Sequence, residues 1–178
     1  MKILVFLSQK GGSGKTTLVV HTAVAAAEAG LKVLVVDTDP QQSATVWSTA
    51  RQAAEPMVAT IAPPDLDRVL AAAKAEGIDL AIVDTAPHAA PEAARIARAA
   101  DMVMIPCRPT AFDLAAAEQA ARIVKAAHAK AAFVLSACPV RAPEIGETRK
   151  ALSDYGLPVA PAEISERRAF TLSIALVV

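Results

Sequence analysis

The sequence predicts an α/β fold in which a mostly parallel, twisted sheet has helices on both faces. Short, continuously apolar runs alternate with longer alanine-rich stretches along all 178 residues. The chain is 54% hydrophobic but only 3% aromatic, so small side chains dominate its apolar share. Strands covered on both faces need continuous hydrophobicity, and alanine favours helices that pack closely on them. A glycine-rich segment also follows the first apolar run, where folds of this class bind phosphates.

Each element follows from the same alternation. Six apolar runs are expected to be strands: Ile3–Leu7, Lys32–Val36, Leu80–Val83, Met102–Ile105, Ala132–Leu135 and a weak one at Leu157–Ala160. Helices are expected at about residues 15–29, 41–54, 65–76, 91–100, 111–129, 143–155 and 165–176. Gly30 and Gly77 stand where two of these helices should end, and Thr110 with Asp113 forms a capping box that opens the longest. Repeats and linkers are not evident, so residues 1–178 are predicted to be one domain.

The composition argues against several classes of function and location. Lys+Arg and Asp+Glu both number 18, which argues against a strongly basic nucleic-acid binder but leaves room for a local basic patch. The two cysteines, Cys107 and Cys138, have no metal-ligand spacing and are expected to be reduced, buried thiols of a cytosolic protein. The apolar start, residues 1–7, lacks a small-residue cleavage site and is expected to be a strand. No apolar run reaches the roughly 18 residues that a membrane span needs.

Residues 10–17 read Lys-Gly-Gly-Ser-Gly-Lys-Thr-Thr, a variant of the phosphate-binding P-loop. The general pattern has a glycine where Gln9 stands, but its Gly-Lys-[Ser/Thr] end is intact. Glycines let successive backbone N–H groups surround phosphates at a helix N-terminus. Lys15 is expected to reach the β- and γ-phosphates of ATP, and the Thr16 hydroxyl to bind Mg²⁺. The predicted nucleotide-binding residues here are Gly11, Gly12, Ser13, Gly14, Lys15, Thr16 and Thr17.

Aspartates follow two further predicted strands. Asp37 and Asp39 come after one, and Asp84 comes after another. Ligands of open α/β sheets lie at the carboxyl ends of the strands. Carboxylates delivered there can hold Mg²⁺ through its waters and position an attacking water. We therefore predict that Thr16, Asp37 and Asp84 form the metal site.

These motifs together resemble the ParA/MinD family of deviant-Walker ATPases. The resemblance rests on three segments in order: residues 10–17, Asp37-Thr38-Asp39-Pro40-Gln41, and Ile82-Val83-Asp84-Thr85-Ala86-Pro87. It extends to about residue 174. Short length, Trp47 and the Ile105–Asp113 stretch make the small ParA-type partition ATPases the most similar branch.

The resemblance implies a role for each matching residue. Lys10 corresponds to the signature lysine that reaches the partner's nucleotide in an ATP-sandwiched dimer, and Asp39 to the aspartate needed for hydrolysis. Asp84 corresponds to the Walker B aspartate. The stretches Pro106–Pro109 and Cys138–Arg141 correspond to adenine-contacting loops, so Pro109 and Arg141 are predicted to contact the base. A cytoplasmic, nucleoid-associated homodimer is implied, which binds ATP/ADP, Mg²⁺, non-specific DNA and a ParB-type or adaptor partner, without membrane binding.

The sequence is also compatible with three other functions. One is a metabolic P-loop enzyme, such as an amidoligase or small-molecule kinase, which Lys10 and the lack of a substrate-binding insertion disfavour. Another is a metal-carrying reductase-like relative, and the third is a nucleotide-binding module without hydrolysis. The family usually continues beyond a helix at residues 164–176, whereas this sequence stops at an apolar Ala175-Leu176-Val177-Val178. We therefore expect that C-terminal helices of the family could be missing.

Overall fold

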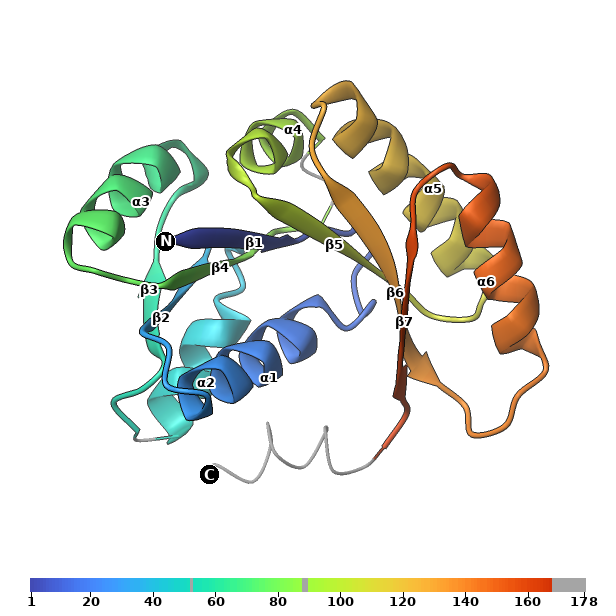
Figure 1. The fold of residues 1–178 in the computed structure, drawn as a ribbon, viewed down its shortest axis with the longest axis horizontal. Coiled ribbons are helices and arrows are strands. Elements are labelled where there is room, and N and C mark those ends of the chain that lie inside the picture. Colours follow the sequence, from blue (N-terminus) through green and yellow to red (C-terminus); the bar gives the residue numbers. More distant parts are fainter. Residues whose placement is uncertain (52, 88–89, 168–178) are drawn as a thin grey trace.

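A parallel sheet forms the centre of the computed structural model, which describes residues 1–51, 53–87 and 90–167 (Figure 1). The strands within these residues are β1 (Lys2–Phe6), β2 (Val33–Asp37), β3 (Met57–Thr60), β4 (Leu80–Asp84), β5 (Met102–Cys107), β6 (Ala131–Cys138) and β7 (Val159–Ser165). Their order is β3-β2-β4-β1-β5-β6-β7, and every neighbouring pair is parallel. The predicted parallel sheet is confirmed.

Helices connect successive strands and cover both faces of the sheet. They are α1 (Lys15–Glu28), α2 (Ser43–Arg51), α3 (Leu66–Ala75), α4 (Ala90–Ala99), α5 (Ala111–Ala126) and α6 (Glu144–Asp154), with a short 3₁₀ turn, η1 (Pro63–Asp65), before α3. Figure 1 shows α1 and α2 on one face and α3 to α6 on the other. The three-layer arrangement is the one that right-handed parallel crossovers produce.

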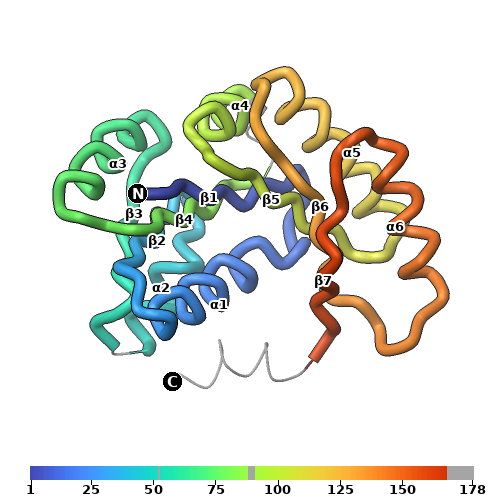
Figure 2. Tube along the Cα trace, viewed as in Figure 1, coloured from blue at the N-terminus to red at the C-terminus, as the bar shows by residue number. Residues whose placement is uncertain are grey.

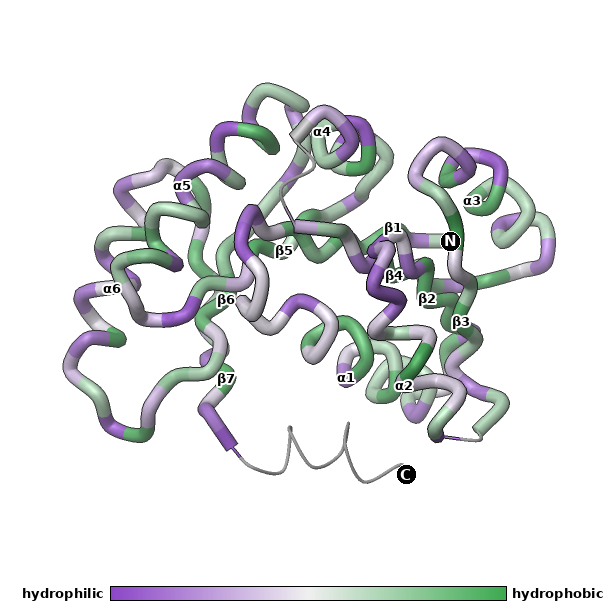
Figure 3. The backbone as a smooth tube through the Cα atoms, turned by 180° about the vertical axis from the view of Figure 1, so that it is seen from behind, coloured by the Kyte–Doolittle hydropathy of each residue, from purple (hydrophilic) through white to green (hydrophobic). Residues whose placement is uncertain are grey.

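Two apolar cores lie on the two faces of the sheet. The larger core, which includes the fully buried Phe133 and Leu135, packs under α3 to α6. The smaller core, which includes Val19 and Trp47, packs under α1 and α2. Figure 3, which colours the chain by hydropathy, shows apolar residues along the central strands. Because both faces are buried, the strands must be apolar throughout, as the sequence pattern predicts.

Strand order positions a ligand site near the middle of the sheet. The chain leaves β1 toward β2 on one side, and it leaves β5 toward β6 on the other (Figure 2). A crevice forms at the carboxyl ends of two neighbouring strands where the connections diverge in this way. The loop after β1 contains the predicted P-loop and the loop after β5 contains Thr110, so both lie at this point.

Two sequence-based predictions need correction. β3 was not predicted because its Met-Val-Ala-Thr segment is only partly buried and sits at the edge of the sheet. The predicted helix at 165–176 is wrong at its start, since Ser165 ends β7 and residues 166–167 are not helical. Pro161 within β7 weakened the strand signal, yet an edge strand tolerates proline because it needs fewer backbone donors. The remainder of that predicted helix lies outside the described residues.

The predicted helix ends are confirmed. Gly30 and Gly77 follow α1 and α3 with φ of 88° and 75°, a left-handed conformation that glycine adopts at little cost. Thr110 caps the start of α5 by accepting a hydrogen bond from the backbone N–H of Asp113, as predicted. The second half of the predicted capping box differs: the Asp113 carboxylate accepts a bond from the Thr110 hydroxyl, while the Thr110 N–H donates to the Arg108 carbonyl. Among the described residues, the helices are too short or too polar to cross a membrane.

Candidate nucleotide-binding site

The loop between β1 and α1 has the backbone that a phosphate site needs. Gly12 and Gly14 have φ of 75° and 90°, so a side chain at either position would strain the loop. Gly14 caps the N-terminus of α1, and its carbonyl accepts the first helical hydrogen bond from Leu18. The predicted loop residues from Gly11 to Thr17 line a cavity of about 210 Å³, apart from Ser13, which is buried beneath it. The helix dipole and the loop amides favour an anion here.

Lys15 is buried in this cavity with only 7% of its surface exposed. Burial lowers the pKa of its ammonium, while the carboxylates of Asp84 and Asp39 act in the opposite direction. Lys15 forms no hydrogen bond or ion pair with the described residues, so its charge is available to a ligand. A phosphate ligand would supply the missing counter-charge.

Asp84, at the end of β4, is the central acidic group. Its carboxylate accepts a hydrogen bond from the Thr16 hydroxyl at 2.7 Å, and its carbonyl accepts two from the backbone and side chain of Thr38, at 3.0 Å and 2.7 Å. Asp84 therefore ties the start of α1 to the ends of β4 and β2. Burial raises the pKa of its carboxyl to about 6, opposed by the Thr16 hydrogen bond and reinforced by the charge of Asp37.

This pair has the donor chemistry of a magnesium site. One carboxylate oxygen of Asp84 accepts the bond from the Thr16 hydroxyl. The other oxygen is buried and has no hydrogen-bond partner among the described groups. Mg²⁺ prefers carboxylate and hydroxyl oxygens of this kind and retains waters in its remaining positions. A cluster of three or more acidic, His or Cys side chains close enough for direct ligation does not occur in the described chain. The site thus fits a water-rich ion held through Thr16 and Asp84.

Asp39 lies at the mouth of the cavity, on the loop after β2. Its carboxylate accepts the backbone N–H of Gln41 at 2.9 Å, and the N–H of Gln42 bonds to its carbonyl. Side-chain turns of this type fix a loop without regular structure. Asp39 and Gln41 both line the cavity beside Lys15, where a carboxylate can orient a water. Asp37, by contrast, is fully buried behind this loop.

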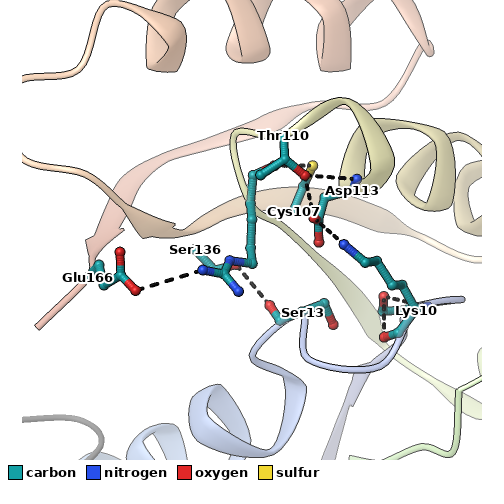
Figure 4. A network of polar contacts seen from close by, with 9 residues as sticks. Lys10, Ser13, Cys107, Thr110, Asp113, Ser136 and Glu166 are labelled. Atoms are coloured by element: carbon teal, nitrogen blue, oxygen red, sulfur yellow. Dashed lines mark hydrogen bonds and ion pairs between the residues drawn. The ribbon is translucent and has the colours of Figure 1, made fainter. Parts of the chain in front are cut away.

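Lys10 does not line this cavity. Its ammonium instead pairs with the Asp113 carboxylate of α5 at 2.6 Å, and Thr110 donates to the same carboxylate oxygen at 2.5 Å (Figure 4). The Lys10 side chain is 39% exposed, whereas Asp113 is 2% exposed. The second lysine of the P-loop is therefore held at the rim, across the crevice between β1 and β5.

Pro109 and Arg141, the predicted base-contacting residues, lie on neighbouring loops outside the phosphate cavity. Pro109 is half-buried before α5, and Arg141 is exposed before α6 with φ of 58°. The two loops follow the paired strands β5 and β6. Their contact with adenine stays a prediction.

The sequence analysis did not predict three contacts that the structure shows around the site. They are the Lys10–Asp113 ion pair, the hydrogen bond from the Ser136 hydroxyl to the Ser13 carbonyl at 2.9 Å, and the Arg108–Glu166 pair at 3.7 Å. Figure 4 shows them side by side where the P-loop meets the ends of β5, β6 and β7. The capping signal of Asp113 was visible in the sequence, but its partner is 103 residues away.

Other candidate residues stay outside the site. Cys107 and Cys138 are free, buried thiols, as predicted, and burial raises the pKa of both, that of Cys107 to about 12. They are therefore poor nucleophiles at neutral pH. His128 is exposed after α5, and His88 lies outside the described residues.

The buried Asp84 makes the stability of the nucleotide-free protein depend on pH. Its folded pKa, about 6, lies above the ordinary value of 3.8, so the folded state binds this proton more tightly and loses stability as pH rises from about 4 to 6. We expect Asp84→Asn to be more stable than wild type at pH 7.5, by up to roughly 3 kcal/mol, with a much smaller difference at pH 4. Urea unfolding without nucleotide or Mg²⁺ measures this.

Asp101→Asn is the matched control. Hydrogen bonds from the Ile3 N–H and Lys2 hold the pKa of the exposed Asp101 below its usual value, so its removal should reduce stability at neutral pH. An Asp84→Asn protein no more stable than wild type at pH 7.5 would contradict a costly buried charge at this position.

Comparison with known proteins agrees with this geometry. Residues 4–173 match the family model described as the CobQ/CobB/MinD/ParA nucleotide binding domain. Protein ParA of Rhizobium radiobacter is 28% identical over 182 residues, covering 96% of this chain and 81% of its own. Maintenance of carboxysome distribution protein A of Gloeobacter kilaueensis is 33% identical over 172 residues, covering 94% and 78%.

Among solved structures, apo McdA of Cyanothece superposes with a TM-score of 0.78 at 16% identity, covering 100% of this chain and 91% of that one. A likeness at this identity supports the fold. The family match spans nearly the whole chain and includes the P-loop, Asp39 and Asp84. The chain belongs to the CobQ/CobB/MinD/ParA nucleotide-binding family.

Proposed function

We propose that this protein is a Mg²⁺-dependent ATPase that dimerises with ATP and positions DNA or another large cargo, with hydrolysis timing its release. The observation that supports it most is Lys10, a second P-loop lysine that the chain holds outside its own phosphate cavity. Lys15 already supplies the cation within that cavity. Lys10, at the rim, could instead reach the nucleotide bound to a second copy of the protein that faces this edge.

The residues around the cavity divide the work of hydrolysis. The loop amides and Lys15 bind the phosphates, and Thr16 with Asp84 would hold Mg²⁺, which neutralises charge on the transferred phosphoryl group. Asp39 orients the water that attacks the γ-phosphorus, as the bond to the β-phosphate oxygen breaks and ADP and phosphate form. Lys10 of a second copy would add positive charge where the transition state needs it. ATP and Mg²⁺ are thus the substrate and cofactor we assign.

The proposal that this protein positions a cargo rests on its similarity to known relatives. ParA of Rhizobium radiobacter and the carboxysome distribution protein align along almost the whole of this chain. We infer that this protein likewise acts in the cytoplasm on the nucleoid, with non-specific DNA and a ParB-type or adaptor partner. The described chain also lacks an added substrate-binding domain, because its helices only connect successive strands. A metabolic enzyme of the amidoligase or kinase type is the weaker alternative.

Asp39→Ala should separate binding from chemistry. Asp39 lines the cavity, and under the proposal it orients water while Lys15 binds the phosphates. Its loss should therefore lower kcat at least a hundredfold and change ATP affinity by less than about threefold. Calorimetry and single-turnover hydrolysis measure the two effects. An equal loss of affinity and turnover would show that Asp39 only supports the loop.

Lys10→Ala should abolish the ATP-dependent dimer but leave the monomer's nucleotide binding within a few-fold of wild type. The reason is that Lys10 has no contact in its own cavity. Light scattering with a non-hydrolysable ATP analogue measures the mass, and calorimetry the binding. Lys32→Ala is the matched control, because Lys32 is an exposed lysine at the opposite, amino-terminal end of β2. A Lys10→Ala protein that dimerises as wild type does would contradict the assignment.

The cargo proposal is tested by the ATPase rate as DNA is added. A DNA-positioning ATPase should respond to DNA of any sequence, and the response should fall steeply with salt because it depends on phosphate contacts. A metabolic enzyme should not respond. A rate independent of DNA and of added salt, in a wild-type protein that hydrolyses ATP, would leave the metabolic alternative ahead.

A further inference from the structure

Asp37 is a fully buried carboxylate whose two oxygens both accept hydrogen bonds from the protein. One oxygen accepts the backbone N–H of Asp39, and the other accepts the backbone N–H and the hydroxyl of Thr45, each at 3.1 Å. Thr45 lies in the first turn of α2, where the helix dipole also favours a negative charge. The Asp37 carboxylate therefore connects the loop that carries Asp39 to the N-terminus of α2.

The connection continues to the edge of the sheet. The hydroxyls of Thr45 and Thr60 lie 2.5 Å apart, and Thr60 ends β3 directly beside Asp37 in the strand register. A carboxylate can only accept, so the Thr45 proton points to Asp37 and Thr60 donates to Thr45. One chain of hydrogen bonds therefore runs from Thr60 through Thr45 and Asp37 to the backbone of Asp39.

This arrangement differs from that of Asp84. Asp84 has one buried carboxylate oxygen without a partner in the described chain, whereas Asp37 has none. Binding a metal ion through Asp37 would compete with three existing hydrogen bonds, two of them from backbone N–H groups that would lose their partner. The contacts of Asp37 point away from the metal role that its position in the sequence suggested.

We propose that Asp37 is a positioning residue: with Thr45 and Thr60 it holds the Asp39 loop and α2 in the geometry that hydrolysis requires. The inference rests on the proposed ATPase function and adds that these three residues position the loop on which that function depends. Asp39 is fixed from both sides, since its own carboxylate holds the Gln41 N–H while Asp37 holds its backbone. Loss of the hydrogen bonds to Asp37 should leave the Asp39 side chain in the protein but change its orientation toward the cavity.

Thr45→Val tests this with little change in shape. It removes the hydroxyl that joins Asp37 to Thr60 and keeps a β-branched side chain. We expect kcat to fall about tenfold, with the Kd for MgATP and the half-saturating Mg²⁺ concentration both within twofold of wild type. Thr45→Ser, which restores the hydroxyl, should recover the wild-type rate. Thr49→Val is the matched control one turn along α2, where the hydroxyl bonds only to the Thr45 carbonyl.

Asp37→Asn distinguishes positioning from metal binding. Under the proposal it lowers kcat without raising the Mg²⁺ requirement, and Asp37→Asn with Thr45→Val is no worse than Asp37→Asn alone, because both break one chain of contacts. A large rise in the Mg²⁺ requirement for Asp37→Asn alone would overturn the proposal in favour of a metal ligand. Additive losses, or a Thr45→Val protein that hydrolyses ATP as wild type does, would also overturn it. A wild-type protein without ATPase activity would instead reject the proposed function.

Discussion

The hydrogen bond from Thr16 to Asp84 is the contact on which the rest of the site depends. It joins the first turn of the P-loop helix to the end of β4, and the Asp84 carbonyl joins the same point to Thr38 after β2. Three segments that are far apart in the sequence thereby meet around one residue. Because Asp84 is fully buried, the hydrogen bond is strengthened by its low-dielectric surroundings, but the same surroundings oppose the charge of the carboxylate. The nucleotide-free site is consequently poised to gain from a cation.

The ion pair between Lys10 and Asp113 also includes a buried carboxylate that needs a cation. Asp113 is buried and would be costly to leave without its cation, so an empty site retains Lys10 at its own rim. A triphosphate carries several negative charges and can compete for the same ammonium. The pair therefore provides a physical reason for a resting state in which the exposed lysine is not free to reach another molecule. ATP bound in a second copy would supply the charge needed to draw it away.

Local features of this fold could be predicted from the sequence. The P-loop, the acidic ends of β2 and β4 and the glycine helix ends are set within a few neighbouring residues, so their patterns are readable. β3 and β7 were missed or shortened because edge strands are half-exposed and tolerate residues such as Pro161. Contacts across the sheet, such as Lys10 with Asp113, depend on the strand order and leave no pattern in one sequence. The position of an aspartate near a strand end likewise does not show whether it lines the cavity, as Asp39 does, or bonds to the adjacent helix, as Asp37 does.

If Lys10 acts on the nucleotide of a second copy, two inactive variants should restore activity when they are mixed. In a mixed dimer of Lys10→Ala and Asp39→Ala subunits, the Lys10→Ala subunit keeps its own Asp39 and would receive Lys10 from its partner. One complete site then forms, so the mixture should hydrolyse ATP well above either variant alone. If Lys10 acted within its own subunit, each site would lack one of the two groups. The mixed dimer keeps one Lys10, and two differently sized tags on the two subunits show whether it forms. A mixture in which the mixed dimer forms and both variants bind ATP, but which is as inactive as its components, would show that Lys10 does not act across the dimer.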